Sequence, residues 1–344
     1  IMKILGIETS CDDTAVGIVE DGRNIITNIV FSQADMHSEF GGIIPEVASR
    51  EHIVKIVPAI NKALTEAKMD LKDIDALSVT CGPGLAGSLL IGVNTAKSMA
   101  IAAGLPFIGV NHIEGHIYAT CLEDVDIREN PGFPLISLVV SGGHTDLILM
   151  KGHGDFQIIA RSRDDAAGEV FDKVARVLGL GFPGGPEIQK VSVKGSLLKP
   201  EFPRPKVKNS MDFSFSGLKT SVVRRAELMG VYPNNSIDNI DQKIADIAKS
   251  FQDAIVDTIV RNTIGAVKKY KAKGLIIGGG VAANKLLRDV FAKESPIDLF
   301  IPRPSLCTDN GAMIASAAYF RLKNNLVYQW DLDVYPSLRI DASK

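Results

Sequence analysis

Residues 4–19 decide the fold class: Ile4-Leu5-Gly6-Ile7 is followed by Glu8-Thr9-Ser10-Cys11-Asp12-Asp13-Thr14 and then by Ala15-Val16-Gly17-Ile18-Val19. The two apolar segments predict strands, and the polar segment between them predicts a tight turn. The plan returns at residues 135–150, where Leu135-Ile136-Ser137-Leu138-Val139-Val140 and Asp146-Leu147-Ile148-Leu149-Met150 flank Ser141-Gly142-Gly143-His144-Thr145. Two such hairpins, one near the start of each half, predict an internal duplication.

Between and after the hairpins, helical and strand patterns alternate along the chain. We expect helices over 45–68 (with a break or kink at Pro58), 87–103, 165–178, 241–271 and 309–321, and strands over 76–80, 107–110 and 275–277. This alternation favours an α/β fold. We expect a first lobe with a helical insertion over residues 1–133 and a second lobe over residues 134–344.

Composition excludes several classes of protein. The chain has 344 residues, 46% of them hydrophobic and 23% charged, which is ordinary for a globular protein of two-domain size. The most apolar stretch, residues 85–110, contains Asn94, Lys97 and Pro106, so it predicts a buried helix and strand rather than a membrane span. The four cysteines have no paired spacing and no signal peptide is recognisable, so we expect a reduced, cytoplasmic protein.

The charge distribution singles out one segment. The net charge is −2, so any contact with nucleic acid must come from a local patch. Residues 189–225 have nine Lys or Arg against Glu201 and Asp212. We interpret this segment as a surface insertion, either a solvated loop or a surface for a phosphate backbone.

The segment His112-Ile113-Glu114-Gly115-His116 places two histidines four residues apart, on one face of a helix. Asp309, in Cys307-Thr308-Asp309-Asn310-Gly311, is the candidate third ligand. Two histidines and one carboxylate with open positions suit iron(II) or catalytic zinc. The alternative is a pair of helical histidines that bind no metal.

Glu114 decides between two kinds of metal enzyme. At ~100° per residue it is rotated ~200° from His112, so it should point away from the metal face. In zinc proteases the glutamate lies directly beside one of the two histidines. The sequence therefore lacks the base that a protease of this kind needs.

Three loops rich in small residues predict a site for a nucleotide or phosphoester between the two lobes. They are Ser141–Thr145, Phe182–Pro186 and Gly278–Asn284. Backbone N–H groups in glycine-rich turns can approach a phosphate closely, and the last loop follows a strand and opens a helix.

Three acidic residues have open interpretations. Asp12 and Asp13 can orient a metal or a water molecule, or simply form a turn. Asp172 can accept a hydrogen bond from a hydroxyl group, or pair with Lys173 or Arg176 on an exposed helix.

Taken together, these motifs resemble the tRNA adenosine threonylcarbamoyltransferase family, formerly described as O-sialoglycoprotein endopeptidases (glycoproteases). The resemblance extends from Gly6–Thr14 to Thr308–Gly311, and Gly41–Arg50 resembles the bacterial branch. It implies a duplicated, two-lobed actin-like or sugar-kinase-like ATPase fold, related to ribonuclease H, with a nucleotide site between the lobes.

The resemblance also implies site residues. His112, His116 and Asp309 would bind the metal, Fe²⁺ in this family with zinc as the alternative, while Asp12 is a candidate catalytic residue. The implied substrate-binding residues are Val139, Val140, Ser141, Gly142, Gly143, Asp172, Gly185, Gln189 and Asn284. Gln189 stands where the family commonly has Asp, which removes a carboxylate but leaves a group that can bond a hydroxyl.

The implied reaction moves a threonylcarbamoyl group from threonylcarbamoyl-AMP to the exocyclic amine of the adenosine 3′ of the anticodon. The substrates would be tRNAs that read codons beginning with A. Implied partners are tRNA, a smaller inactive paralogue, for which residues 45–68 offer a dimerisation face, and a small P-loop ATPase. ATP or ADP is an alternative occupant of the same cleft. A small-molecule kinase of the same superfamily, a metalloprotease and a non-catalytic scaffold are the rival interpretations.

Overall fold

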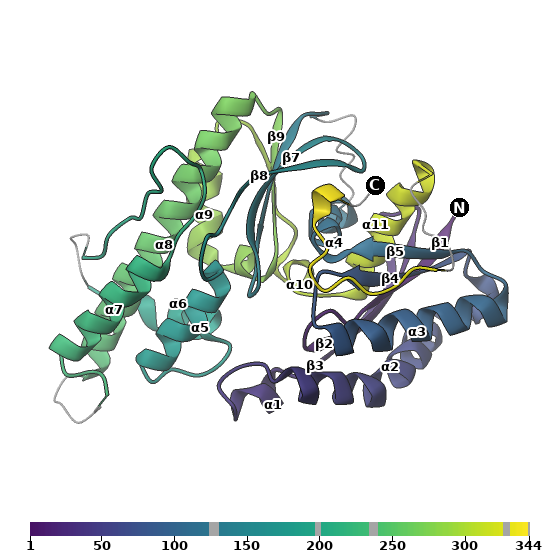
Figure 1. Ribbon diagram of the computed structural model, residues 1–344, viewed down its shortest axis with the longest axis horizontal. Coiled ribbons are helices and arrows are strands. Elements are labelled where there is room, and N and C mark those ends of the chain that lie inside the picture. Colours follow the sequence, from purple (N-terminus) through teal and green to yellow (C-terminus); the bar gives the residue numbers. More distant parts are fainter. Residues whose placement is uncertain (124–130, 197–200, 234–239, 326–330, 343–344) are drawn as a thin grey trace.

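A computed structural model of the protein describes residues 1–123, 131–196, 201–233, 240–325 and 331–342. It contains two five-stranded sheets flanked by helices (Figure 1). The strands are β1 (Lys3–Glu8), β2 (Asp13–Glu20), β3 (Asn24–Ser32), β4 (Ala76–Gly82), β5 (Phe107–Asn111), β6 (Leu135–Val140), β7 (Thr145–Gly152), β8 (Asp155–Arg161), β9 (Gly274–Gly278) and β10 (Asp298–Phe300).

The helices cover the sheets and fill the space between them. The α-helices are α1 (Ala34–Ser38), α2 (Pro45–Ala67), α3 (Ala86–Ala103), α4 (His112–Tyr118), α5 (Ala167–Val177), α6 (Gly184–Ser192), α7 (Ser216–Leu228), α8 (Ile240–Tyr270), α9 (Lys285–Glu294), α10 (Pro304–Cys307) and α11 (Gly311–Lys323). Short 3₁₀ helices are η1 (Leu71–Asp73), η2 (Ala119–Glu123), η3 (Gly280–Ala283) and η4 (Ile340–Ala342). Among these described elements, no helix has the length and apolar character needed to span a bilayer.

The two sheets have the same topology, which confirms the predicted duplication. The first has the strand order β3-β2-β1-β4-β5, and the second, from the corresponding edge, β8-β7-β6-β9-β10. In each sheet the first three strands form an antiparallel meander. The next two strands are parallel to the central one. Each half of the chain therefore builds the same α/β unit from its own hairpin.

Helices on both faces explain why the central strands are almost continuously apolar. In β1, Ile4, Leu5 and Ile7 are at most 1% exposed. One apolar core belongs to the second sheet with α5, α7 and α8, and another to the first sheet with α2 and α3. A third core lies between the sheets and contains side chains of both sheets, α4 and α11. The elements that will hold the candidate metal ligands are thus fixed from both sides.

Helix α11 comes late in the chain but packs on the first sheet. Gly6, Gly17 and Gly311 allow this approach, because a Cβ atom at any of them would overlap backbone atoms of the opposing element. The lobe boundary expected between residues 133 and 134 stays a prediction. Helix α11 belongs to the second half of the chain, yet it packs on the sheet of the first half.

Two further segments differ from simple expectation. The chain is not broken at Pro58, since α2 runs as one helix from Pro45 to Ala67, and a kink at this residue stays a prediction. In the segment 189–225, Phe213 and Leu218 are fully buried, so part of this basic segment packs into the core of the second sheet. Residues 197–200, including Lys199, lie outside the described residues.

Candidate metal centre and adjoining pocket

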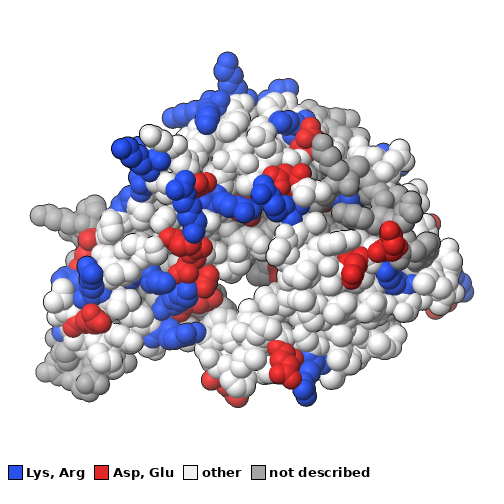
Figure 2. Space-filling model, viewed as in Figure 1, with Lys and Arg blue, Asp and Glu red and all other residues white. Residues whose placement is uncertain are grey.

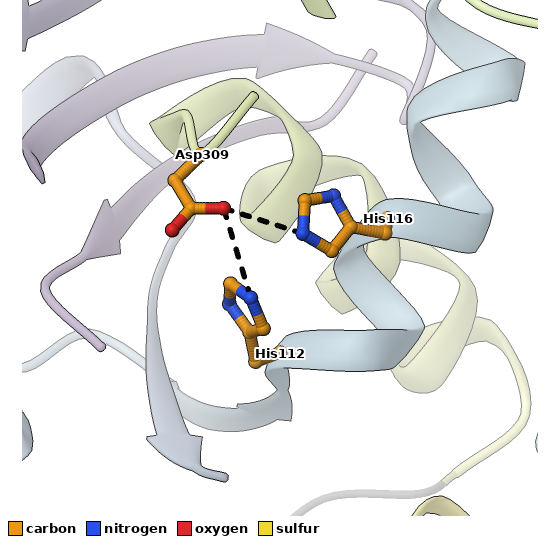
Figure 3. A group of neighbouring side chains, drawn as sticks. All are labelled: His112, His116 and Asp309. Carbon is orange, nitrogen blue, oxygen red and sulfur yellow. Dashed lines mark ion pairs between the residues drawn. The ribbon is translucent and has the colours of Figure 1, made fainter. Parts of the chain in front are cut away.

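Helix α4 begins directly after β5, and this junction positions both candidate histidines. Asn111 caps the helix, its side-chain oxygen accepting a hydrogen bond from the Ile113 N–H at 2.9 Å. His112 is the first helical residue and His116 follows one turn later. Both rings face Asp309, which lies between α10 and α11 (Figure 3). The helical face predicted from the spacing is confirmed.

The three side chains converge closely. Asp309 Oδ1 lies 3.2 Å from His116 Nε2 and 3.7 Å from His112 Nε2. The three potential ligand atoms lie within 4.8 Å of one another. Neither ring nitrogen of the fully buried His116 has a hydrogen-bond partner in the described part of the chain, because the contact to Asp309 is not aligned as a hydrogen bond. Buried polar atoms without partners are costly, so this donor set fits a divalent metal ion.

Glu8, at the end of β1, orients His112 from behind. Its Oε2 lies 3.1 Å from His112 Nδ1, and Ser10 Oγ lies 3.0 Å from the same nitrogen. Thr80 donates a hydrogen bond to Glu8 at 2.5 Å. A carboxylate that holds one imidazole nitrogen leaves the other free to coordinate a metal. Sequence reasoning did not single out Glu8, although a charged residue ending an apolar strand was a usable signal.

The carboxylates of Asp309 and Glu8 favour a positive charge on His112. Burial alone would lower the pKa of His112, but Asp309 and Glu8 outweigh it and raise that pKa to about 9. Burial opposes ionisation of Asp309, yet His112 and His116 bring its pKa well below the ordinary value. His144, whose ring lies 6.3 Å from that of His112, has its pKa lowered to about 3 by burial and by the two histidines, so its ring is neutral at pH 7.

Glu114 lies on the opposite side of α4, as its rotation predicted. Its carboxylate accepts a hydrogen bond from Arg321 of α11 at 2.7 Å, and both side chains are at most 3% exposed. Because this carboxylate is held in an ion pair away from the cluster, the chain has no protease base at this position.

A pocket of about 320 Å³ adjoins the metal cluster. Its lining residues are Gly142, Gly168, Phe171, Asp172, Pro183, Gly185, Pro186, Gln189, Gly280, Val281, Ala283, Asn284 and Thr308. Gly142, Asp172, Gly185, Gln189 and Asn284 were among the expected substrate-binding residues. Thr308 directly precedes Asp309, which links the pocket to the metal cluster.

The other four expected substrate residues lie nearby but do not line this pocket. Val139 and Val140 end β6 and are fully buried. Ser141 accepts a hydrogen bond from the His144 N–H at 3.2 Å, which closes the turn that contains Gly143. Their role in binding substrate stays a prediction.

The starts of several helices meet at the pocket. Gly168 lies in the first turn of α5 and Gly185 in the first turn of α6, while Asn284 caps α9. Helix N-termini carry unpaired N–H groups and a partial positive charge, so they attract anions. The glycine-rich loops singled out in the sequence thus form one wall suited to a phosphate.

The polar side chains of the pocket already have protein partners. Asp172 accepts a hydrogen bond from Gly184 N at 2.7 Å, whereas Lys173 pairs with Asp165 and Glu169 instead. Gln189 accepts from Lys285 N at 2.6 Å, which leaves its NH₂ group as a donor toward the pocket. Asn284 donates to Gln252 at 2.8 Å and accepts from Leu287 N at 3.1 Å.

Asp12 and Asp13 lie at the turn between β1 and β2, within the electrostatic field of Asp309. The pKa of both carboxyl groups is raised, mainly by burial and next by the nearby charge of Asp309. The pKa of Asp13 reaches about 7. One oxygen of Asp13 is buried without a hydrogen-bond partner in the described residues.

The fold and the site together define an α/β protein built from two sheets of one topology, with a His-His-Asp centre that could bind a metal. HypF of T. kodakarensis has the same fold, with a TM-score of 0.61 and 16% identity over 94% of this chain and 48% of that one. Component A of (R)-2-hydroxyglutaryl-CoA dehydratase from Acidaminococcus fermentans has a TM-score of 0.55 and 15% identity, covering 94% of this chain and all of that one.

Sequence comparison gives the particular family. Residues 24–316 match the profile of TsaD, tRNA N6-adenosine threonylcarbamoyltransferase. The protein of that name from Dehalococcoides mccartyi is 50% identical over 341 residues, which cover 99% of this chain and 100% of that protein. The chain therefore belongs to the tRNA N6-adenosine threonylcarbamoyltransferase family, which confirms the resemblance and the transferase class expected from its motifs.

Proposed function

We propose that the protein transfers the threonylcarbamoyl group of threonylcarbamoyl-AMP to the exocyclic amine of the adenosine 3′ of the anticodon, in tRNAs that read codons beginning with A. The observation that carries this proposal is the match to the family over nearly the whole chain. The His112, His116 and Asp309 cluster beside an anion-attracting pocket supports it, because acyl transfer from an adenylate needs both a phosphate site and a polarised carbonyl.

In this proposal His112, His116 and Asp309 hold a divalent metal, Fe²⁺ or zinc. When bound, the metal supplies a Lewis acid that can polarise the carbamoyl carbonyl. Glu8 fixes the ring of His112 through Nδ1, so that Nε2 stays directed at the cluster. The protein contributes a pre-oriented ligand set at low exposure.

The adjoining pocket binds the nucleotide portion of the substrate. Backbone N–H groups at Gly142 and Gly185 contact the phosphate of the AMP leaving group, and the helix N-termini stabilise its charge. The carboxylate of Asp172 and the amide of Gln189 contact hydroxyl groups of the ribose, because both line the pocket and can form such bonds. Asp12 orients the incoming amine from the side of the β1–β2 turn.

Helix α2 provides a face for the smaller paralogue. Ile53, Val54 and Val57 are 55–60% exposed along one segment of this helix. A contiguous exposed apolar face of this kind is typical of a protein interface. The small P-loop ATPase joins this assembly, and ATP or ADP remains an alternative occupant of the pocket.

Nucleoside mass spectrometry tests the proposal. An unmodified tRNA that reads codons beginning with A is incubated with the protein, threonylcarbamoyl-AMP and both bacterial partner proteins. We expect threonylcarbamoyladenosine from the wild type and none above background from His112→Ala with His116→Ala. Asp309→Asn, which keeps the shape of the side chain, should lose most of the product as well.

The controls make a negative result informative. Circular dichroism shows whether each variant is folded, and metal analysis shows whether the wild type is loaded. No product from folded, metal-loaded wild type, with partners that are active on a known relative, would refute the proposed function. ATP-dependent phosphorylation of a small molecule would then become the leading alternative.

A further inference from the structure

Six exposed lysines lie in the loop that contains residues 206–208 and around the end of α8 and the start of β9. The lysine patch consists of Lys206, Lys208, Lys268, Lys269, Lys271 and Lys273, all of them exposed. Lys206, Lys208 and Lys269 line one shallow, open hollow of about 630 Å³, which joins the loop 206–211 to the end of α8. In Figure 2 basic side chains project from the upper edge of the molecule, where Figure 1 places the end of α8 and the start of β9.

The charges of the lysine patch are not neutralised within the protein. None of the six ammonium groups forms an ion pair in the part of the chain that the structure describes. Elsewhere in the second lobe, by contrast, Lys173, Lys219 and Lys285 each pair with a carboxylate. In a chain whose net charge is −2, the patch is therefore a local positive field that remains available to a partner.

The lysine patch lies away from the metal centre. Lys273 directly precedes β9, whereas Gly278 at the other end of β9 lies against the backbone of His116. Five residues of a strand span about 16 Å. A ligand that touches both the patch and the metal centre must therefore be large and carry several negative charges.

We propose that the lysine patch is a docking surface for the phosphate backbone of tRNA, outside the loop that enters the active site. This inference rests on the proposed function, because a tRNA that presents one adenosine at the cleft leaves most of its backbone outside it. Exposed lysines without partners suit phosphates as point charges and carry no sequence information. The patch would then contribute affinity and association rate rather than chemistry.

Binding of labelled tRNA, measured by fluorescence anisotropy between 50 and 200 mM salt, tests this surface. The variant Lys206→Gln/Lys208→Gln/Lys269→Gln removes the charges that line the hollow. Lys3→Gln/Lys72→Gln/Lys323→Gln is the matched control, because it removes the same charge from solvent-accessible side chains of β1, η1 and α11, outside α2 and the lysine patch. We expect the patch variant to bind about tenfold more weakly at low salt, and its log–log salt slope to fall by ~2–3, while the control keeps the wild-type slope.

Steady-state kinetics provide a second readout. In the assembled enzyme the patch variant should raise KM for tRNA about tenfold and leave kcat unchanged, because the patch contacts no reacting atom. Wild-type binding and slope in the patch variant would overturn the proposal, and so would equal losses in both variants. A patch variant that binds tRNA normally but loses binding to vesicles containing phosphatidylserine would assign the surface to membranes and overturn it too.

Failure of this inference can be separated from failure of the proposed function. The anisotropy measurement requires no product. If the wild type forms no threonylcarbamoyladenosine but its tRNA binding depends on the lysine patch, only the proposed function fails. If product forms and binding is independent of the patch, only this inference fails.

Discussion

The buried ion pair between Glu114 and Arg321 should be a main determinant of how α4 is held against α11. The pair connects the helix that contains both histidines to the helix that begins two residues after Asp309. Its atoms are 2.7 Å apart, and the two side chains are 1% and 3% exposed. The substitution Glu114→Gln keeps the size of the side chain and removes the carboxylate charge that pairs with Arg321.

The magnitude follows from this burial. Removing one partner of a buried ion pair costs about 3–5 kcal/mol, because the remaining charge is desolvated without compensation. Burial raises the pKa of Glu114 and Arg321 opposes that shift, so the comparison belongs at pH 8, where the carboxylate is ionised most completely. We also expect metal affinity to fall roughly tenfold, since the orientation of α4 sets the positions of both histidines.

Two further variants isolate the cause. Glu114→Met with Arg321→Met replaces the pair by apolar side chains of similar size and should regain most of the lost stability. Glu46→Gln breaks the ion pair with Arg50 on α2, whose side chains are 75% and 77% exposed. That control should change stability by less than about 1 kcal/mol.

Urea unfolding of the metal-free protein measures the stability, and titration with Co²⁺ followed by its visible spectrum measures both metal affinity and ligand geometry. An equal loss in Glu114→Gln and Glu46→Gln would refute the reasoning. So would a double Met variant that is as unstable as Glu114→Gln, because the loss would then come from packing rather than from the broken ion pair.

Three other changes test separate parts of the site. Glu8→Gln should lower metal affinity about 10–100-fold, because it removes the carboxylate behind His112. Metal content after dialysis against a graded chelator measures this, with Glu46→Gln as the control. Unchanged metal retention in Glu8→Gln would contradict the role assigned to Glu8. Burial raises the pKa of Asp146 to about 6, so its contribution to stability is present below the unfolded pKa near 4 and is lost as the pH rises through 6. Asp146→Asn should therefore be more stable than the wild type by up to about 3 kcal/mol at pH 7.5, with a smaller gain at pH 5. Thermal unfolding at both pH values measures the gain. A gain that does not depend on pH would contradict this prediction. Gly279 has φ +92°, and a Cβ atom there would overlap the Val140 carbonyl. Gly279→Ala should therefore displace η3, weaken AMP binding measured by calorimetry, and leave metal binding intact. Unaltered AMP affinity would show that η3 does not shape the pocket.

Local patterns in the sequence were enough to predict the main elements of the fold and the centre of the site. Apolar runs on either side of polar turns located the paired hairpins, and their recurrence predicted the internal duplication that the two sheets confirm. The four-residue spacing placed His112 and His116 on one face of α4 and turned Glu114 away from it. These features depend only on the period of a helix or strand, so they can be read from a short stretch of chain.

Other features depend on which distant segments meet. Glu8 and Arg321 lie 104 and 207 residues from their partners His112 and Glu114, and no local pattern indicates those pairs. Of the break or kink expected at Pro58, the break does not occur, because packing of α2 on β2, β3 and α3 holds the helix together despite one missing backbone bond.

The sequence by itself determined the duplicated α/β units, the ligand types and the family resemblance, because each is written in residue identity and short-range spacing. Only the tertiary structure decided that Asp309 reaches α4, that five of the expected substrate residues share one pocket, and that Lys206 and Lys208 line one hollow with Lys269. The first outcome depends on how α4 and α11 pack between the two sheets, and the other two depend on how helices and loops of the second half pack around β6–β9. Such packing is a cooperative property of the whole chain rather than of any one segment.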